Sequence, residues 1–209
     1  MTIQTINASM LCFFNERLMA MGVKDGGLKN YYQERVRKNS ILGELDLYLI
    51  DIIQKRYPGD TVIHEIACGA AQLAHTLWLL GYRTSASEIG EKRHRLAVDL
   101  GKYLGSGCHV LHGNSFLVET DADLYVTGNA VTSMIRLENS IEFIKEKLGN
   151  GSDLIFNADL CGDVKDDNRK TLSDSGIKYQ ELKKGFLLLQ GEMYRHKKSL
   201  YFKYIQLKT

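Results

Sequence analysis

A turn of small side chains and a later acid are the residues of this chain whose spacing favours binding chemistry. The turn is Ala67-Cys68-Gly69-Ala70-Ala71, and it follows the apolar residues of an expected strand over 61–66. Small side chains let the backbone N–H groups of a turn approach a ligand closely. Glu88 ends the next expected strand, nineteen residues after Gly69, and a carboxylate there can accept both hydroxyl protons of a ribose. The spacing predicts a site for a nucleoside-bearing cofactor.

Two further turns follow expected strands and point to the same edge of a sheet. Gly113-Asn114-Ser115 comes after the strand over 108–112, where an amide side chain and an adenine edge can meet. Thr127-Gly128-Asn129 comes after the strand over 123–127, beside the expected reacting centre. In open α/β sheets, ligands bind beyond the carboxyl ends of the strands at the point where the strand order reverses. Both turns are therefore expected at the cofactor site.

The chain from residue 61 onward alternates between strand and helix patterns. The expected strands cover 61–66, 83–88, 108–112, 123–127 and 153–158, and the expected helices cover 70–80, 91–103, 133–147 and 167–174. Two long strands, 178–190 and 193–207, close the chain and are expected to pair near Gly191. This order predicts an α/β fold with a doubly wound, mostly parallel seven-stranded sheet and an antiparallel terminal strand.

The first sixty residues have helical rather than strand periodicity. Apolar residues recur at helical spacings over 1–24, and a second helical region runs over 28–55. We therefore expect an N-terminal helical cap over 1–59 and a Rossmann-like domain over 60–209. We expect these helices to form a lid over the site, an interface in a homodimer, or both. Substrate contacts are expected from the cap and from the end of the fourth strand, namely Tyr31, Tyr32, Arg35 and Thr127.

The composition of the sequence limits the classes of partner and the cellular location that we expect. The chain has 27 Lys and Arg against 25 Asp and Glu, a net charge of +2, which gives no electrostatic reason to expect nucleic acid or membrane. The four cysteines form no C-x-x-C pair and the six histidines lack metal-ligand spacing, so we expect no metal site. No secretory signal and no apolar run of roughly 20 residues is present. We expect a cytoplasmic protein with a small-molecule substrate.

The segment Glu65-Ile66-Ala67-Cys68-Gly69-Ala70-Ala71 resembles the first motif, (D/E)-x-G-x-G-x-G, of class I S-adenosylmethionine-dependent methyltransferases. Glu88 matches the acid that binds the cofactor ribose in that family, and the resemblance covers residues 60–209. It implies S-adenosylmethionine as the cofactor and an in-line methyl transfer, and it identifies no catalytic residue. The cofactor-binding residues that it implies are Glu65, Ala67, Cys68, Gly69, Glu88, Ile89, Asn114, Ser115 and Asn129.

The sequence departs from the family pattern at two of the three motif glycines, where Ala67 and Ala71 stand. Because alanine does not adopt positive φ easily, we expect a slightly different loop. The sequence after the fourth strand is not N-P-P-Y, which argues against methylation of nucleic-acid bases. Two alternatives stay open. One is a catalytically inactive module that binds the cofactor or assembles with a partner. The other is a nicotinamide-dependent oxidoreductase, which the lack of G-x-G-x-x-G disfavours.

Overall fold

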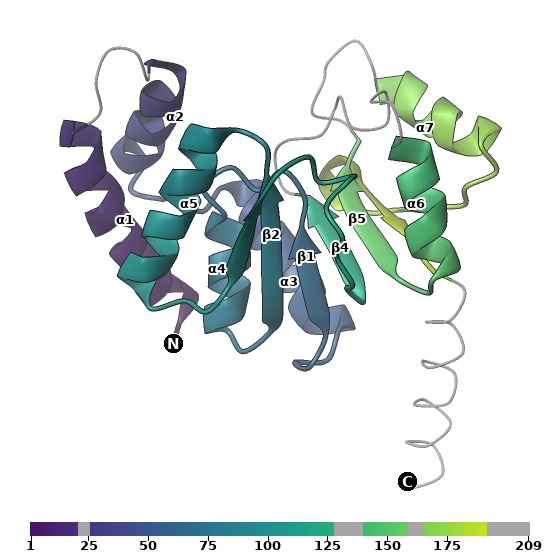
Figure 1. Ribbon diagram of the computed structural model, residues 1–209, viewed down its shortest axis with the longest axis horizontal. Coiled ribbons are helices and arrows are strands. Elements are labelled where there is room, and N and C mark those ends of the chain that lie inside the picture. The colour runs from purple at the N-terminus through teal and green to yellow at the C-terminus, as the bar shows by residue number, and fades with distance from the viewer. Residues whose placement is uncertain (21–25, 128–139, 159–164, 192–209) are drawn as a thin grey trace, which may run out of the picture.

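The computed structural model describes residues 1–20, 26–127, 140–158 and 165–191. These residues contain one seven-stranded sheet with the order β3-β2-β1-β4-β5-β7-β6 (Figure 1). The strands are β1 Val62–Glu65, β2 Arg83–Glu88, β3 His109–His112, β4 Leu124–Thr127, β5 Asp153–Asn157, β6 Gln180–Glu181 and β7 Phe186–Leu189. Neighbouring strands pair in parallel except at β7, which is antiparallel to β5 and β6. The predicted doubly wound α/β sheet with a reversed strand is confirmed.

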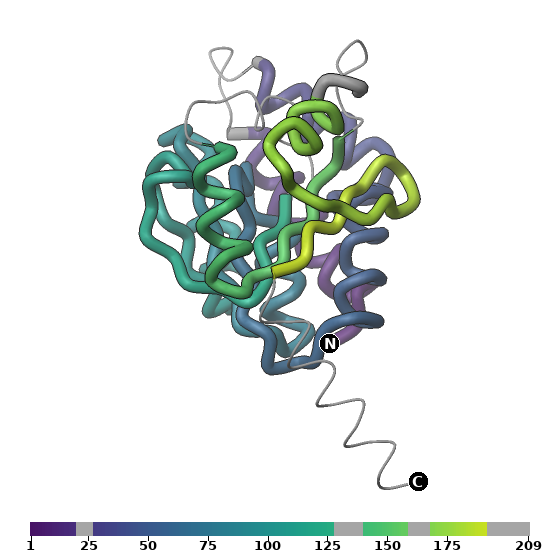
Figure 2. Tube along the Cα trace, turned by 90° about the vertical axis from the view of Figure 1, so that its right-hand side faces the viewer, coloured from purple at the N-terminus to yellow at the C-terminus, as the bar shows by residue number. Residues whose placement is uncertain are grey.

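Helices cover both faces of this sheet. They are α1 Ile3–Ala20, α2 Gly26–Arg37, α3 Glu44–Arg56, α4 Gln72–Leu79, α5 Glu91–Leu104, α6 Ser140–Gly149 and α7 Lys165–Asp174. Side chains of α1 to α5 share a core with Ile63 and Leu124 on one face, and α6 and α7 pack with Tyr125 and Phe156 on the other. Figure 2 shows α6 and α3 on opposite sides of the sheet. No helix among the described residues is long and apolar enough to cross a membrane.

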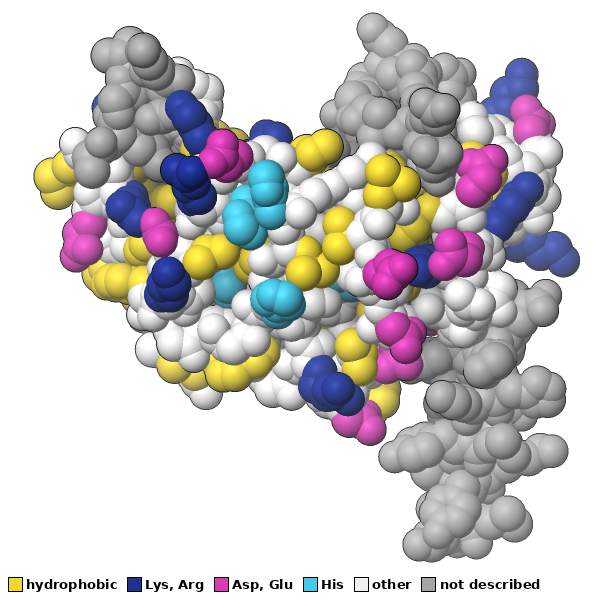
Figure 3. Space-filling model, in the orientation of Figure 1, with side chains coloured by type: hydrophobic (Ala, Val, Ile, Leu, Met, Phe, Trp, Pro, Cys, Tyr) yellow, Lys and Arg dark blue, Asp and Glu magenta, His cyan; other side chains and the backbone are white. Residues whose placement is uncertain are grey.

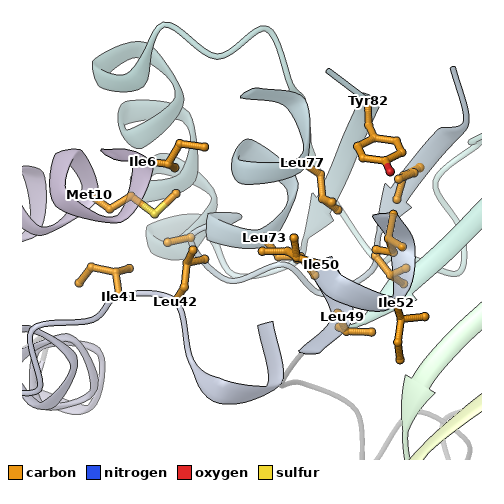
Figure 4. Packing of buried hydrophobic residues seen from close by; sticks show 14 of the residues in the cluster. Ile6, Met10, Ile41, Leu42, Leu49, Ile50, Ile52, Leu73, Leu77 and Tyr82 are labelled. Carbon is orange, nitrogen blue, oxygen red and sulfur yellow. The ribbon is translucent and has the colours of Figure 1, made fainter. Parts of the chain in front are cut away.

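The N-terminal helices belong to the main core. Ile6 and Met10 of α1 are fully buried and pack in one cluster with Leu42, before α3, and with Leu73 and Leu77 of α4 (Figure 4). Burying such side chains stabilises the folded chain by about 1.5–3 kcal/mol each. The helical segment over 1–59 is therefore packed as part of the fold, against the helix that follows β1.

The helical region predicted over 28–55 is two helices. Helix α2 ends at Arg37, and Asn39 has a left-handed φ of 53°, which a helix cannot continue through. Helix α3 begins after Gly43, whose N–H donates to the Asp46 carboxylate at 2.7 Å. This bond satisfies a backbone donor at the start of the helix, so the chain turns here rather than continuing as one rod.

The segment predicted as one strand over 178–190 is a hairpin of two strands. The segment 178–190, predicted as one strand, contains both β6 and β7, separated by a tight turn at Lys183–Gly185. Lys184 and Gly185 take left-handed φ values of 59° and 74°, which reverse the chain. The pattern missed the turn because the residues on either side of it have a strand-like composition. The predicted strand over 193–207 and the first part of the predicted helix over 133–147 lie outside the described residues.

Candidate functional site

The loop after β1 keeps its backbone left-handed at three alternate positions. Ala67, Gly69 and Ala71 have φ values of 51°, 60° and 56°, at the three places where the resembling motif has glycine. The expectation that alanine would change this loop is therefore wrong for its left-handed residues, which alanine adopts at a cost of about 1–2 kcal/mol each. A Cβ added at Gly69 would meet no described atom within 4 Å. The space beside Gly69 is open to a ligand.

Glu88 is fixed against this loop at the carboxyl end of β2. Its Oε2 accepts from the Gly69 N–H at 2.9 Å, and its Oε1 accepts from the Gly90 N–H at 2.7 Å and from Arg93 Nε at 3.1 Å. A carboxylate has about four acceptor directions, so one remains. The Arg93 side chain is 52% exposed, and an ion pair to such a side chain is replaced at little cost. The carboxylate can therefore take two hydroxyl groups of a ribose.

A buried acid and a buried thiol lie close to the loop after β1. Glu65 accepts from the Ala74 N–H at 2.9 Å, beneath the first turn of α4. Burial raises the pKa of Glu65 well above its usual range, and the nearby charges of Asp46 and Glu88 raise it further. Burial likewise raises the pKa of the Cys68 thiol well above normal, so Cys68 stays protonated and is not a nucleophile.

The turn after β3 joins the same site. Asn114 Oδ1 accepts from the Phe116 N–H at 3.0 Å, which holds the turn in shape. Ser115 Oγ accepts from the Ala67 N–H at 3.2 Å, so this turn and the loop after β1 are directly bonded. Ile89, at the end of β2, is 63% exposed and offers an apolar surface to a flat ring. These residues can surround a nucleoside between the two turns.

The end of β4 contributes one buried hydroxyl. Thr127 is 1% exposed, and its Oγ1 has no hydrogen-bond partner among the described residues. An unpaired buried hydroxyl costs about 1–3 kcal/mol, which makes this atom a candidate contact for a ligand. Thr127 lies beside the loop after β1, because its neighbour Val126 accepts from the Ile66 N–H at 2.8 Å. The other candidate from this turn, Asn129, lies outside the described residues.

The three cap residues differ in their exposure. Tyr32 is buried, its ring stacks on Phe14 with centroids 4.0 Å apart, and its hydroxyl donates to Gln72 at 3.4 Å. Tyr32 is thus a core residue that ties α2 to the start of α4. Tyr31 is 39% exposed and accepts from Arg35 Nη2 at 3.0 Å. Tyr31 and the half-buried Arg35 are therefore the two of these residues that are open to a substrate.

Sequence reasoning missed several polar residues that surround the loop. Gln72 and Asp46 are buried beneath it, and the sequence marks Asp46 only through its place three residues after Gly43, a typical helix-start spacing. His64 is also buried, in the middle of β1. A lone histidine inside a strand pattern gives no sign of what it contacts, because its partners come from another strand.

Comparison with known proteins identifies the fold. No family model matches the sequence, and no curated protein sequence matches it. A TehB-like S-adenosylmethionine-dependent methyltransferase from Corynebacterium glutamicum superposes with a TM-score of 0.57 at 16% identity, over 79% of this chain and 96% of that one. A ribosomal protein L11 methylase from Lactobacillus delbrueckii subsp. bulgaricus gives 0.55 at 15% identity, over 70% and 76%. A methyltransferase from Pyrococcus furiosus gives 0.52 at 15% identity, over 70% and 82%.

These likenesses together define the architecture. The sheet order, the reversed β7 and the N-terminal helices are those of the class I S-adenosylmethionine-dependent methyltransferase fold. At these identities the structures share the fold, and the chemistry of this chain has to be argued from its own site.

Proposed function

We propose that this protein binds S-adenosylmethionine at the carboxyl ends of β1 and β2 and transfers its methyl group to a small-molecule acceptor. The observation that carries the proposal is the Glu88 carboxylate held against a loop with left-handed residues at 67, 69 and 71. That arrangement presents a ribose-binding acid and open backbone in one place. The class I methyltransferase fold supports the same conclusion.

Each residue of the site has a proposed task in holding the cofactor. Glu88 accepts from the ribose hydroxyls, Gly69 lets the ligand approach the backbone, and Ile89 packs on the adenine ring. The cofactor supplies an electrophilic methyl group on a sulfonium. The loop aligns that methyl group and keeps water away from it, which are the main contributions a protein makes to such a transfer.

The acceptor is proposed to enter past Tyr31 and Arg35, with Thr127 facing the methyl group. A small acceptor is favoured over nucleic acid because the net charge is +2 and because cationic and anionic side chains are interspersed on the face drawn in Figure 3. Tyr31 is a polar aromatic surface and Arg35 a cation, so an acceptor with an anionic group fits them. We also propose a cytoplasmic location and keep a homodimer through the N-terminal helices as a hypothesis.

Calorimetry tests the cofactor first. The purified protein is titrated with S-adenosylmethionine, S-adenosylhomocysteine and a nicotinamide dinucleotide, and we expect micromolar binding of the adenosyl ligands alone. Binding of the nicotinamide dinucleotide in their place would overturn the proposal in favour of an oxidoreductase. Methyl transfer is then measured with S-adenosylmethionine labelled in its methyl group and pools of small metabolites, in which a labelled product is expected.

A cofactor-binding module without catalysis is the second candidate function. The observation in its favour is the left-handed alanine at positions 67 and 71, since these residues keep the loop conformation at a cost in stability. Such a module would bind S-adenosylhomocysteine but give no labelled product with any acceptor pool. Product analysis therefore separates the two functions, while calorimetry alone does not.

A further inference from the structure

A buried hydrogen-bond network of hydroxyl groups and one histidine runs from the middle of the sheet to the loop after β1. His64 of β1 pairs in register with Ser85 of β2. Its Nδ1 lies 2.8 Å from Ser85 Oγ, and its Nε2 lies 2.8 Å from Ser87 Oγ. Ser87 Oγ donates to Ser115 Oγ at 2.7 Å, and Ser115 Oγ accepts from the Ala67 N–H at 3.2 Å. Four side chains therefore connect β1, β2 and the turn after β3 to the loop after β1.

The donors in this hydrogen-bond network determine the tautomer of His64. Ser87 has one hydroxyl proton, and that proton is given to Ser115. Ser87 therefore cannot donate to His64, so the contact at Nε2 must be an N–H of the imidazole donating to Ser87 Oγ. Nδ1 is then the acceptor, and Ser85 donates to it. Burial and the charge of Lys147 lower the pKa of His64 to about 4, so the ring is neutral and carries one proton at pH 7.

This hydrogen-bond network ends with a hydroxyl proton, that of Ser115, for which the described residues offer no acceptor. Ser115 Oγ accepts from both Ser87 and Ala67, and neither contact uses the hydroxyl proton of Ser115 itself. Ser115 is 7% exposed and lies directly after Asn114, between the two turns that face the expected nucleoside. With its oxygen held by two donors, the third direction at Ser115 belongs to its own O–H. That O–H is a preset donor at the edge of the site.

We propose that His64 is a positioning residue: through Ser87 it orients the Ser115 hydroxyl so that its proton is presented to a ring nitrogen of the bound adenine. This inference rests on the proposed function, because the ligand is the cofactor proposed there. Adenine ring nitrogens are acceptors, and a neutral hydroxyl donor held in advance binds them without losing rotor freedom on binding. A fully paired buried network of this kind also keeps the two turns in a fixed relation. His64 itself touches no ligand.

Nuclear magnetic resonance of the ligand-free protein tests the tautomer inferred for His64. The ¹⁵N shifts of the His64 ring distinguish a protonated Nε2 from a protonated Nδ1. We expect the proton on Nε2 in the wild type. A proton on Nδ1 would reverse every donor in the chain and overturn the inference, whether or not the protein binds the cofactor.

Calorimetry with S-adenosylhomocysteine tests whether the Ser115 hydroxyl, oriented through Ser87, contributes to ligand binding. Ser115→Ala and Ser87→Ala are each expected to weaken binding by about three- to tenfold, the range for one neutral hydrogen bond. The double variant should lose no more than the larger single loss, because both changes remove one donor. Ser152→Ala is the matched control: Ser152 is also a buried serine, but it donates to the Ala122 carbonyl, and its loss should leave affinity unchanged.

Ligand analogues separate a direct contact from a structural effect. S-adenosylhomocysteine analogues with one ring nitrogen replaced by C–H are titrated against the wild type and Ser115→Ala. One analogue should bind more weakly than S-adenosylhomocysteine to the wild type but equally well to Ser115→Ala, because the variant lacks the hydroxyl that donates to the replaced nitrogen. Equal losses in both proteins for every analogue would overturn the contact. If the wild type binds no S-adenosylhomocysteine, the proposed function fails together with this contact, and the tautomer then shows whether the donor chain itself is right.

Discussion

The Glu88 carboxylate accepts a 2.9 Å hydrogen bond from the backbone N–H of Gly69, which lies nineteen residues earlier in the chain. The same carboxylate accepts a 2.7 Å hydrogen bond from the Gly90 N–H. One side chain therefore fixes two turns, the one after β1 and the one after β2. A hydrogen bond to a charged group contributes about 1.5–3 kcal/mol, so the loop and the ribose-binding acid are set in place together before a ligand arrives.

Substituting Glu88 by glutamine is expected to weaken S-adenosylhomocysteine binding by about 1–3 kcal/mol. The amide keeps the size of the side chain but loses the charge and part of the acceptor capacity. Glu91→Gln is the matched control, because Glu91 is exposed and pairs with Arg95 on its own helix, and it should leave the dissociation constant unchanged. Calorimetry measures both. An unaltered constant for Glu88→Gln would remove Glu88 from the site.

Replacing the left-handed Ala67 by glycine is expected to stabilise the protein. Ala67 and Ala71 have φ values of 51° and 56°, and glycine adopts such values without steric cost. Ala67→Gly should raise the free energy of unfolding by about 1 kcal/mol, after the entropy cost of glycine is included. Ala71 is fully buried, so Ala71→Gly also loses a buried methyl group, which costs about 0.8 kcal/mol and offsets most of the gain. Ala97→Gly, within α5, should instead lower the free energy of unfolding by about 1 kcal/mol. Urea unfolding gives all three values, and destabilisation by Ala67→Gly would contradict the backbone assignment.

Acid should destabilise the folded chain through His64. Its pKa in the folded protein is about 4 against 6.5 in the unfolded chain, because of burial and the charge of Lys147. Between these values the unfolded chain binds a proton that the folded chain does not, so stability falls as the pH falls from 6.5 to 4. The loss is about 3 kcal/mol. In His64→Gln this part of the pH dependence should be missing.

Urea unfolding of the wild type and His64→Gln at several pH values measures this effect. The gap in unfolding free energy between the two proteins should shrink as the pH falls towards 4 and stay constant below it. Taking the difference removes the contributions of other titrating groups, including Glu65, which burial affects in the opposite sense. A gap that does not change with pH would show that folding does not lower the pKa of His64.

Helix α1 is expected to be required for stability rather than for substrate capture alone. Phe14 is fully buried and stacks on Tyr32, so Phe14→Ala should lower the free energy of unfolding by about 3–5 kcal/mol. Met19 on the same helix is 84% exposed, and Met19→Ala should change it by less than about 0.5 kcal/mol. Thermal or urea unfolding compares them. Equal effects would mean that α1 is not packed in the core.

The alternation of strands and helices, and the place of Glu88 at the end of β2, could be predicted from sequence alone. Apolar periodicity is a local property, so it indicates which segments are strands and which turns follow them. The same local reasoning missed the turn within 178–190, because the turn at Lys183–Gly185 contains one glycine and no proline to mark it. It also joined α2 to α3, since the break depends on one left-handed residue, Asn39.

The site itself was decided in part by contacts that no local pattern encodes. Ser115 meets the Ala67 N–H across 48 residues, and Tyr32 reaches Gln72 across 40. His64 gains its partners through the parallel register of β1 on β2, which brings Ser85 and Ser87 to the same face as the imidazole. The sequence by itself determined the order of the elements and the acid after the loop, because these depend on near neighbours. Only the tertiary structure decided which polar atoms are paired, because strand register and packing join residues that the chain keeps far apart.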